Sequence, residues 1–234
     1  MNDPVAKLPT RVIKLGGSLL GNSDTPQRIE LWLVKQAECQ KPGDSKLWRN
    51  FWIVGGGELA DTVRDWDAKF SLEPSFTHWI CIDLMDINAR LLSAWFTQWP
   101  IIDQFSSDHE SGNQIANQIP NQIVLVSPWL RQGNTDLPQS WATTSDSIAM
   151  AAADLLQADE LVLLKSCDPP GFLEALDPSG PSGLSLEWLS LESLARSDFV
   201  DKQFVPQFRS LTKKMSVRLV NFNSGLFSEA VLKQ

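Results

Sequence analysis

Residues 12–20 read Val-Ile-Lys-Leu-Gly-Gly-Ser-Leu-Leu, a short β-branched run that leads through Lys14 to two glycines and a serine. The pattern predicts a strand followed by a loop with few side chains, with the Lys14 ammonium at its rim. Such loops let backbone N–H groups approach phosphate oxygens more closely than bulkier residues allow. Gly16, Gly17 and Ser18 are therefore candidates for binding an anionic group.

A second glycine loop, Gly55-Gly56-Gly57, directly follows a strand-like run at 51–54 and leads into a predicted helix over 58–70. A helix N-terminus attracts anions because its first N–H groups lack partners and its dipole is positive there. For a lone triple glycine, the alternative is a tight turn without a ligand. Two such junctions in one chain favour a site that holds two anionic groups face to face.

Length and charge exclude several classes of protein. The 234 residues suit one large domain, and no apolar run reaches the roughly 20 residues that cross a membrane. A net charge of −8 without a basic block argues against nucleic acid as a partner, but not against a small phosphorylated ligand. The N-terminus lacks the apolar core of a signal peptide, so we expect a cytoplasmic protein. Three cysteines without metal-ligand spacing predict free thiols and no protein-bound metal.

Strand-like and helix-like stretches alternate along the chain, which predicts an α/β fold with a mainly parallel sheet covered on both faces. The strand candidates are residues 11–15, 51–54, 123–126, 160–164 and 217–222. The helix candidates are residues 28–39, 58–70, 76–97, 146–156, 189–196, 201–213 and 227–232. Loops are expected at residues 22–27, 106–122 and 168–183, and the whole of 1–234 is expected to form a single domain.

The segment Thr143-Thr-Ser-Asp-Ser-Ile-Ala-Met-Ala-Ala-Ala-Asp opens a predicted helix of small residues. Ser145 or Thr144 can cap this helix, and Asp146 in its first turn suits the helix dipole. Taken alone, Asp146 is only a helix-start carboxylate. The small residues after it predict close packing against the sheet, which would bring Asp146 near the two glycine loops.

Lys165-Ser-Cys-Asp168 follows the strand expected at 160–164, at the end of the sheet where α/β proteins bind ligands. Asp168 either contacts a nucleotide or begins the long loop, and the sequence leaves both interpretations open. His78 lies near the start of the helix over 76–97, where it either binds substrate or is buried in a helix interface.

Arg64 lies in the second turn after the triple glycine. Its guanidinium can hold two phosphate oxygens at once, which makes it a candidate for binding a phosphorylated substrate. The alternative is a surface arginine paired with Asp61 or Asp65.

Together these stretches resemble the amino acid kinase superfamily, which includes acetylglutamate, aspartate, uridylate and isopentenyl phosphate kinases. The residues that match its motifs are Lys14–Ser18, Gly55–Gly57, Ser145-Asp146 and Ala158-Asp159, in a likeness that runs from residue 12 to about 225. Three segments are also similar to the small kinases of methanofuran biosynthesis, which phosphorylate an aminomethylfuran-methyl phosphate. The resemblance implies a three-layer αβα sandwich, the use of ATP and Mg²⁺, and a homo-oligomer.

The resemblance implies three catalytic residues. Lys14 neutralises the transferring phosphoryl group, Asp146 holds the Lys14 ammonium, and Lys202 approaches from the nucleotide side. Lys213 and Lys214 are rivals for the place of Lys202. Mg²⁺ is expected to be bound mostly by nucleotide oxygens and water.

The single domain is expected to have an acceptor-side lobe of about 1–140 and a nucleotide-side lobe of about 141–234. The γ-phosphate is expected between the two glycine loops. The residues expected to bind nucleotide phosphates are Gly16, Gly17, Ser18, Lys165 and Asp168, and those expected to bind the acceptor are Gly55, Gly56, Gly57, Arg64 and His78.

We expect ATP-dependent phosphoryl transfer to a small acidic metabolite. The first candidate for this acceptor is a phosphate monoester that is converted to a diphosphate, as in the methanofuran pathway. One alternative is a kinase for a carboxylate of the N-acyl amino acid type. Another is a nucleotide- or metabolite-binding sensor that has lost transfer. The family's Thr-Asp-Val-Asp-Gly is replaced here by Lys165-Ser-Cys-Asp168-Pro, which favours the sensor, whereas the intact Lys14, triple glycine and Asp146 favour the enzyme.

Overall fold

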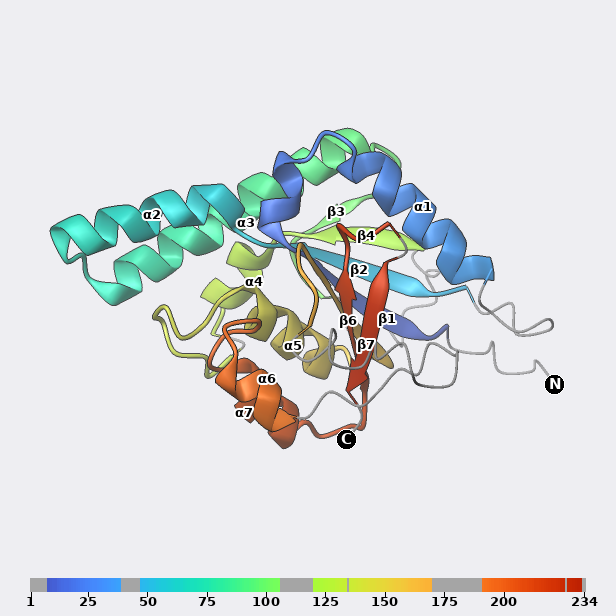
Figure 1. Ribbon diagram of the computed structural model, residues 1–234. Helices are drawn as coiled ribbons and strands as arrows, with labels where there is room; N and C mark the ends of the chain where they lie inside the picture. The colour runs from blue at the N-terminus through green and yellow to red at the C-terminus, as the bar shows by residue number, and fades with distance from the viewer. Residues whose placement is uncertain are drawn as a thin grey trace, which may run out of the picture.

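The computed structural model describes residues 8–38, 47–105, 120–133, 135–169, 191–225 and 227–232. The strands in this part of the chain are β1 (Thr10–Leu15), β2 (Arg49–Val54), β3 (Ile101–Ile102), β4 (Asn121–Val124), β5 (Glu160–Lys165), β6 (Ser216–Asn221) and β7 (Ser228–Leu232). They form one twisted sheet (Figure 1). The strand order in this sheet is β3-β4-β2-β1-β5-β6-β7. Neighbouring strands are parallel except β6 and β7, so the predicted α/β class with a mainly parallel sheet is confirmed.

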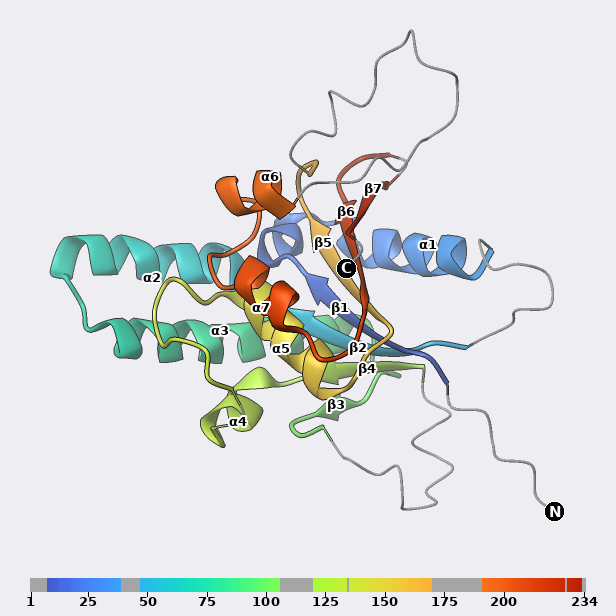
Figure 2. The same cartoon turned by 90° about the horizontal axis from the view of Figure 1, so that it is seen from below.

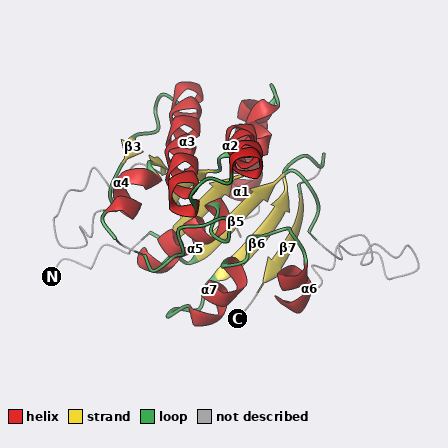
Figure 3. Ribbon diagram, turned by 90° about the vertical axis from the view of Figure 1, so that its left-hand side faces the viewer, coloured by secondary structure: helices red, strands yellow, loops and turns green. Residues whose placement is uncertain are grey.

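Helices cover both faces of this sheet. The helices are α1 (Thr25–Glu38), α2 (Gly57–Phe70), α3 (Pro74–Trp95), α4 (Val126–Arg131), α5 (Ser145–Leu155), α6 (Leu191–Arg196) and α7 (Phe204–Ser210), with a 3-10 turn η1 at Gly17–Gly21. α1 and the second half of α3 enclose one apolar core against the sheet, and α5 and α7 enclose another on the opposite face (Figure 3). α2 and α3 form an antiparallel pair that extends beyond the sheet (Figure 2).

The centre of the sheet places three strand ends side by side. β1 lies between β2 and β5, and the order of strands along the chain reverses there. Ligands in open α/β sheets bind at such a point, outside the carboxyl ends of the strands. The loops after these strands are tied to their neighbours, because the Gly16 N–H donates to the Leu164 carbonyl and the Gly55 N–H donates to the Leu15 carbonyl, both at 2.9 Å.

The helix expected over residues 227–232 is wrong, because this segment forms β7. Its sequence is rich in helix formers, but tertiary pairing overrides that preference. β7 pairs antiparallel with β6 and buries Ala230 and Leu232 in alternation. The Arg218 guanidinium lies 3.1 Å from the Glu229 carboxylate, which holds the two strands together on the other face.

The helix expected over residues 201–213 is shorter than predicted. Asp201 precedes α7, and its carboxylate accepts hydrogen bonds from the N–H groups of Gln203 and Phe204, which marks the helix start. The helix ends before Leu211, whose ψ of 134° is extended. Among the other predicted elements, the loop expected at 22–27 ends early because α1 begins at Thr25, and most of the loops expected at 106–122 and 168–183 lies outside the described residues.

The strand expected at 123–126 ends at Val124, and the short helix α4 then begins. A carboxylate from another helix causes this change. Asp86 of α3 accepts a hydrogen bond from the Val126 N–H at 2.7 Å, and its two oxygens share the N–H of Ser127 at 3.3 Å. In the described part of the chain, no helix combines the length and apolar character needed to cross a bilayer.

Candidate active site

A cavity of about 330 Å³ lies at the carboxyl ends of the three central strands. Most of the residues predicted for the site contribute to its wall: Lys14, Gly16, Gly17, Ser18, Gly55, Gly56, Gly57, Arg64, His78 and Lys165. Two groups of residues lie at or directly behind its wall. We call Lys14, Asp146, Lys165 and the two glycine loops the strand end, and Asp61, Arg64, His78 and Trp141 the helix end.

The two glycine loops touch each other directly. A Cβ atom on Gly17 would lie 2.2 Å from the Gly57 nitrogen and 2.5 Å from the Gly55 carbonyl oxygen, so only glycine fits at this position. Gly57 itself has a φ of +56°, in the left-handed region that favours glycine. The two loops are therefore in direct backbone contact, and they leave no room between Gly17 and Gly57 for the γ-phosphate expected between the loops.

Asn88 fixes the second loop, and the sequence analysis missed it. This buried side chain of α3 donates hydrogen bonds from Nδ2 to the carbonyls of Gly55 at 2.7 Å and Gly56 at 3.0 Å. Two peptide groups of the loop are thereby held against α3. A single asparagine inside a helical pattern carries no signal of this contact.

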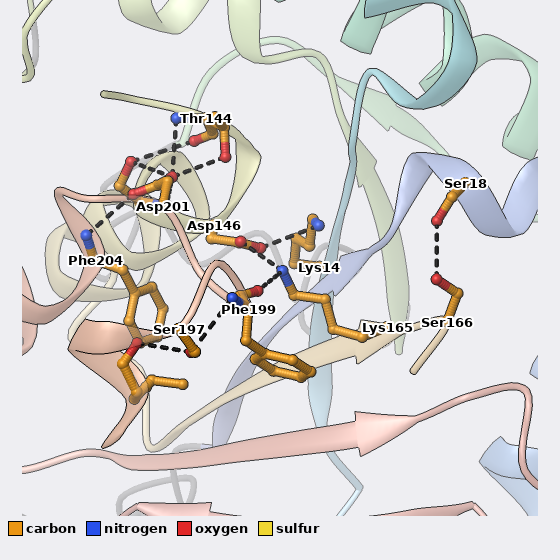
Figure 4. Close-up of polar contacts among 12 residues, drawn as sticks. Lys14, Ser18, Thr144, Asp146, Lys165, Ser166, Ser197, Phe199, Asp201 and Phe204 are labelled. Carbon is orange, nitrogen blue, oxygen red and sulfur yellow. Dashed lines mark hydrogen bonds and ion pairs between the residues drawn. The ribbon is translucent and has the colours of Figure 1, made fainter. Parts of the chain in front are cut away.

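Lys14, Asp146 and Lys165 form a buried charged cluster at the strand end (Figure 4). The Lys14 Nζ lies 3.0 Å from one Asp146 oxygen, and the Lys165 Nζ lies 2.6 Å from the other. The predicted contact between Lys14 and Asp146 is therefore present. Asp146 itself is not part of the cavity wall and lies behind the two lysines.

The pKa values in this cluster follow from burial and charge. Burial lowers the pKa of Lys14; the Asp146 carboxylate opposes this change and the Lys165 ammonium adds to it. Burial alone would raise the pKa of Asp146, but the two neighbouring ammonium groups outweigh it and hold that pKa below its usual value. Asp146 is therefore ionised at neutral pH.

The start of α5, which carries Asp146, is capped by a residue that is distant in the sequence. Thr144 is the N-cap residue, but neither its side chain nor that of Ser145 makes the predicted capping bond. Instead, one oxygen of Asp201 accepts hydrogen bonds from the N–H and hydroxyl groups of Thr144 and Ser147, at 2.8–3.0 Å (Figure 4). After this cap, the small residues of α5 pack against the sheet as predicted, and Ala149, Ala152 and Ala153 are fully buried.

The helix end of the cavity combines charged and aromatic side chains. Arg64 lines the cavity and also forms an ion pair with Asp61, and its guanidinium carbon lies 4.8 Å from the centre of the Trp141 ring. Both predicted interpretations of Arg64 are thus compatible with its position. His78 is buried in the wall, and burial lowers its pKa more than a hydrogen bond with the Ser140 backbone raises it, which favours a neutral imidazole.

Besides Asp146, two further predicted site residues are not part of the cavity wall. The Lys202 side chain is exposed and does not line the cavity, although its neighbour Asp201 reaches α5. The Asp168 carboxylate accepts hydrogen bonds from Asn221 at 2.8 Å and Ser228 at 2.7 Å, so it fastens β7 to the end of β6. This contact exists because residues 228–232 form a strand, which the sequence analysis did not predict. The described residues contain no group of three or more His, Cys, Asp or Glu side chains placed to hold a metal ion.

Comparison with known proteins identifies the family. The family model "Amino acid kinase family" matches residues 9–173, well over half of the chain. The chain therefore belongs to the amino acid kinase family, and the prediction that it is a kinase is confirmed.

Two curated relatives extend over most of the chain. A [5-(aminomethyl)furan-3-yl]methyl phosphate kinase of Methanocaldococcus jannaschii is 24% identical over 213 residues, which cover 90% of this chain and 87% of that protein. A uridylate kinase of Methanosarcina barkeri is 26% identical over 186 residues, which cover 78% of this chain and 70% of that protein.

Solved structures confirm the amino acid kinase-like fold. A UMP kinase from Ureaplasma parvum has a TM-score of 0.60 at 12% identity, covering 97% of this chain and 100% of that one. A uridylate kinase from Archaeoglobus fulgidus has a TM-score of 0.54 at 19% identity, covering 88% of this chain and 89% of that one.

Proposed function

We propose that this protein transfers the γ-phosphoryl group of ATP to a small phosphate monoester and so produces a diphosphate. The observation that carries the proposal is the buried cluster of Lys14, Asp146 and Lys165 beside two touching glycine loops. Both curated relatives described above have names that state a phosphorylated acceptor, which favours a phosphate over a carboxylate. A phosphate ester of the (aminomethyl)furan type is the first candidate.

The reaction needs charge neutralisation more than it needs a base. An acceptor phosphate has a second pKa near 6, so one of its oxygens is already ionised at neutral pH. This oxygen attacks the γ-phosphorus, the bond from phosphorus to the β,γ-bridging oxygen breaks, and the electron pair stays on the departing ADP. The products are ADP and a diphosphate, with no proton to remove from the acceptor. The chief barrier is the repulsion between two anions, which a buried ammonium reduces.

The residues of the strand end suit this task. Lys14 would bind the transferring group, and Asp146 would hold the Lys14 ammonium in place without touching the substrate. Gly16, Gly17 and Ser18 would bind nucleotide phosphates through backbone N–H groups. Because the glycine loops touch, the transferring phosphoryl group would lie beside them, towards the two lysines, and not between them. Mg²⁺ would be bound mostly by nucleotide oxygens and water.

The helix end suits the acceptor. Arg64 and His78 line the cavity here, so an acceptor phosphate would lie near them and near the triple glycine Gly55–Gly57 of the strand end. A neutral His78 could donate one hydrogen bond, whereas the Arg64 guanidinium could exchange its contact with Asp61 for phosphate oxygens.

Phosphorus NMR of reaction mixtures tests the proposal. Purified protein is incubated with ATP, Mg²⁺ and one acceptor: [5-(aminomethyl)furan-3-yl]methyl phosphate, UMP, or an N-acyl amino acid. The proposal predicts ADP together with the two coupled resonances of a new diphosphate for a phosphate ester, and no product for the carboxylate. Transfer to the carboxylate alone would establish the alternative kinase. ATP binding without transfer to any acceptor would establish a sensor.

A further inference from the structure

We infer that Lys165 is the second cation that binds the transferring phosphoryl group, in the place for which the sequence predicts Lys202. This inference rests on the proposed function. The first observation is the register of the sheet. Lys14 of β1 is paired with Leu163 of β5, and Leu163 lies two residues before Lys165. Side chains two residues apart in a strand point to the same face. Lys14 and Lys165 therefore point to the same face from adjacent strands and meet at Asp146 (Figure 4).

The other lysines proposed for this role are in the wrong place. Lys202 and Lys214 are exposed, and neither is part of the cavity wall. The Lys213 Nζ lies 2.8 Å from the Asp159 carboxylate, at the start of β5. Lys165 ends the same strand, and a strand of this length spans roughly 20 Å. Among the described lysines of residues 141–232, Lys165 is the one that lines the cavity.

The bonding of the Lys165 ammonium leaves it able to bind a ligand. An ammonium group has three N–H donors. One donates to Asp146 and a second to the Phe199 carbonyl, both at 2.6 Å. Because Lys165 is also part of the cavity wall, its third N–H is available to a phosphate oxygen there.

The charge of the cluster points to an anionic ligand. Two ammonium groups share one carboxylate, and the three side chains are only 5–14% exposed. These three side chains carry one excess positive charge. The nearby Asp201 carboxylate acts on Lys14 only through space, because its oxygens accept hydrogen bonds at the starts of α5 and α7. A buried excess charge is unfavourable unless an opposite charge compensates it. A phosphoryl group that contacts both lysines would supply that charge, and its developing negative charge in the transition state would be bound most strongly.

A matched pair of substitutions tests the inference. Lys165→Met and Lys202→Met each remove one ammonium and keep an unbranched stem. We expect Lys165→Met to lower kcat by about 10²- to 10³-fold, the usual effect of removing a group that stabilises transition-state charge. Lys202→Met is expected to stay within about twofold of the wild type. Equal losses in the two variants, or an unchanged Lys165→Met, would overturn the inference.

Ligand binding tests Lys165 without relying on turnover. Inorganic tripolyphosphate should raise the melting temperature of the wild type and of Lys202→Met, because a ligand that binds the folded state stabilises it. The shift should be absent in Lys165→Met at the same concentration. A shift equal to that of the wild type would contradict the inference even if no acceptor were found, whereas failure of the proposed function would appear only as absent transfer.

A second variant separates charge from packing. Lys165→Gln carries an amide that can still donate to the Phe199 carbonyl, but it has no charge. We expect this variant to fold like the wild type and to lose tripolyphosphate binding as Lys165→Met does. Retention of wild-type binding by Lys165→Gln would show that the charge is not needed and would refute the role assigned to Lys165.

Discussion

The charged groups at the strand end of the cavity are buried, and they come from two strands and the start of a buried helix. Those at the helix end are exposed and lie on one turn of α2. The side chains of Lys14, Asp146 and Lys165 are at most 14% exposed. Those of Arg64 and Asp61 are 53% and 67% exposed, three residues apart on the same helix. Both ends thus hold ion pairs, but in very different surroundings.

The difference separates two tasks. Buried charges interact strongly because the local dielectric is low, and the sheet fixes their geometry before any ligand arrives. Such preorganised groups stabilise charge in a transition state, which suits transfer chemistry. Exposed pairs contribute little to stability and can exchange partners easily, which suits recognition of an acceptor. We therefore expect substitutions at the strand end to affect kcat and stability, and those at the helix end to affect the acceptor KM.

The largest effect is expected for Gly17→Ala at the strand end. The added Cβ would lie 2.2 Å from the Gly57 nitrogen, and a backbone atom cannot move aside as a flexible side chain can. Because the obstructing atoms belong to the backbone, the destabilisation should exceed the roughly 1–3 kcal/mol that is usual for an overpacked side chain. Turnover should be lost and the melting temperature should fall. Gly225→Ala is the matched control, because no atom lies within 4 Å of its Cβ position, and it should behave as the wild type.

The next largest effect is expected for the buried carboxylate of Asp146, compared with the exposed carboxylate of Asp61. Asp146→Asn leaves two buried ammonium groups without a counter-charge, so the free energy of unfolding should fall by about 3–5 kcal/mol. Asp61→Asn breaks an exposed pair and should change it by about 1 kcal/mol or less. Urea unfolding at pH 7 measures both. Similar values for the two variants would contradict the contrast between the two ends.

The pH dependence of the free energy of unfolding also distinguishes Asp146 from Asp61. Folding lowers the pKa of Asp146, so the unfolded chain binds protons more readily. The stability that this carboxylate contributes is therefore present above its ordinary value of 3.8 and is lost as pH falls through the lowered pKa. The Asp146→Asn variant should lack this part of the loss of stability at low pH. The Asp61→Asn variant should lose stability at low pH as the wild type does.

A smaller effect is expected for Arg64→Ala at the helix end. If Arg64 binds the acceptor phosphate, the acceptor KM should rise about tenfold or more, because hydrogen bonds to charged groups contribute about 1.5–3 kcal/mol. The KM for ATP should stay within about twofold. Arg131→Ala is a close control, since Arg131 also pairs with an aspartate and lies over a tryptophan ring, but it does not line the cavity. Equal changes in both KM values would remove Arg64 from the acceptor site.

The parts of the site that sequence could predict are those with a local signal. Gly17 and Gly57 must be glycine for steric reasons, so the backbone contact leaves a visible mark in the sequence. Lys14 is identified by its place just before the first loop, and Asp146 by its place at a helix start followed by small residues. Both signals lie within a few residues of the group concerned.

The parts that sequence missed depend on contacts between distant segments. Asp201 caps α5 from 57 residues away from Thr144, and Asp86 caps α4 from 40 residues away from Val126. Neither carboxylate lies near the helix start that it stabilises. The role of Asp168 was missed for the same reason, because its partner Ser228 lies 60 residues away on a strand expected to be a helix.

The turnover of Lys14→Ala with ATP and the phosphate ester that the wild type accepts decides whether the strand end carries the transfer chemistry. Lys69→Ala, an exposed lysine near the end of α2, is the control. We predict that Lys14→Ala keeps its fold and loses about 10²- to 10³-fold in kcat, because it removes charge stabilisation from the transition state. Lys69→Ala should match the wild type. A kcat for Lys14→Ala within a few-fold of the wild type would contradict the assignment of transfer chemistry to the strand end.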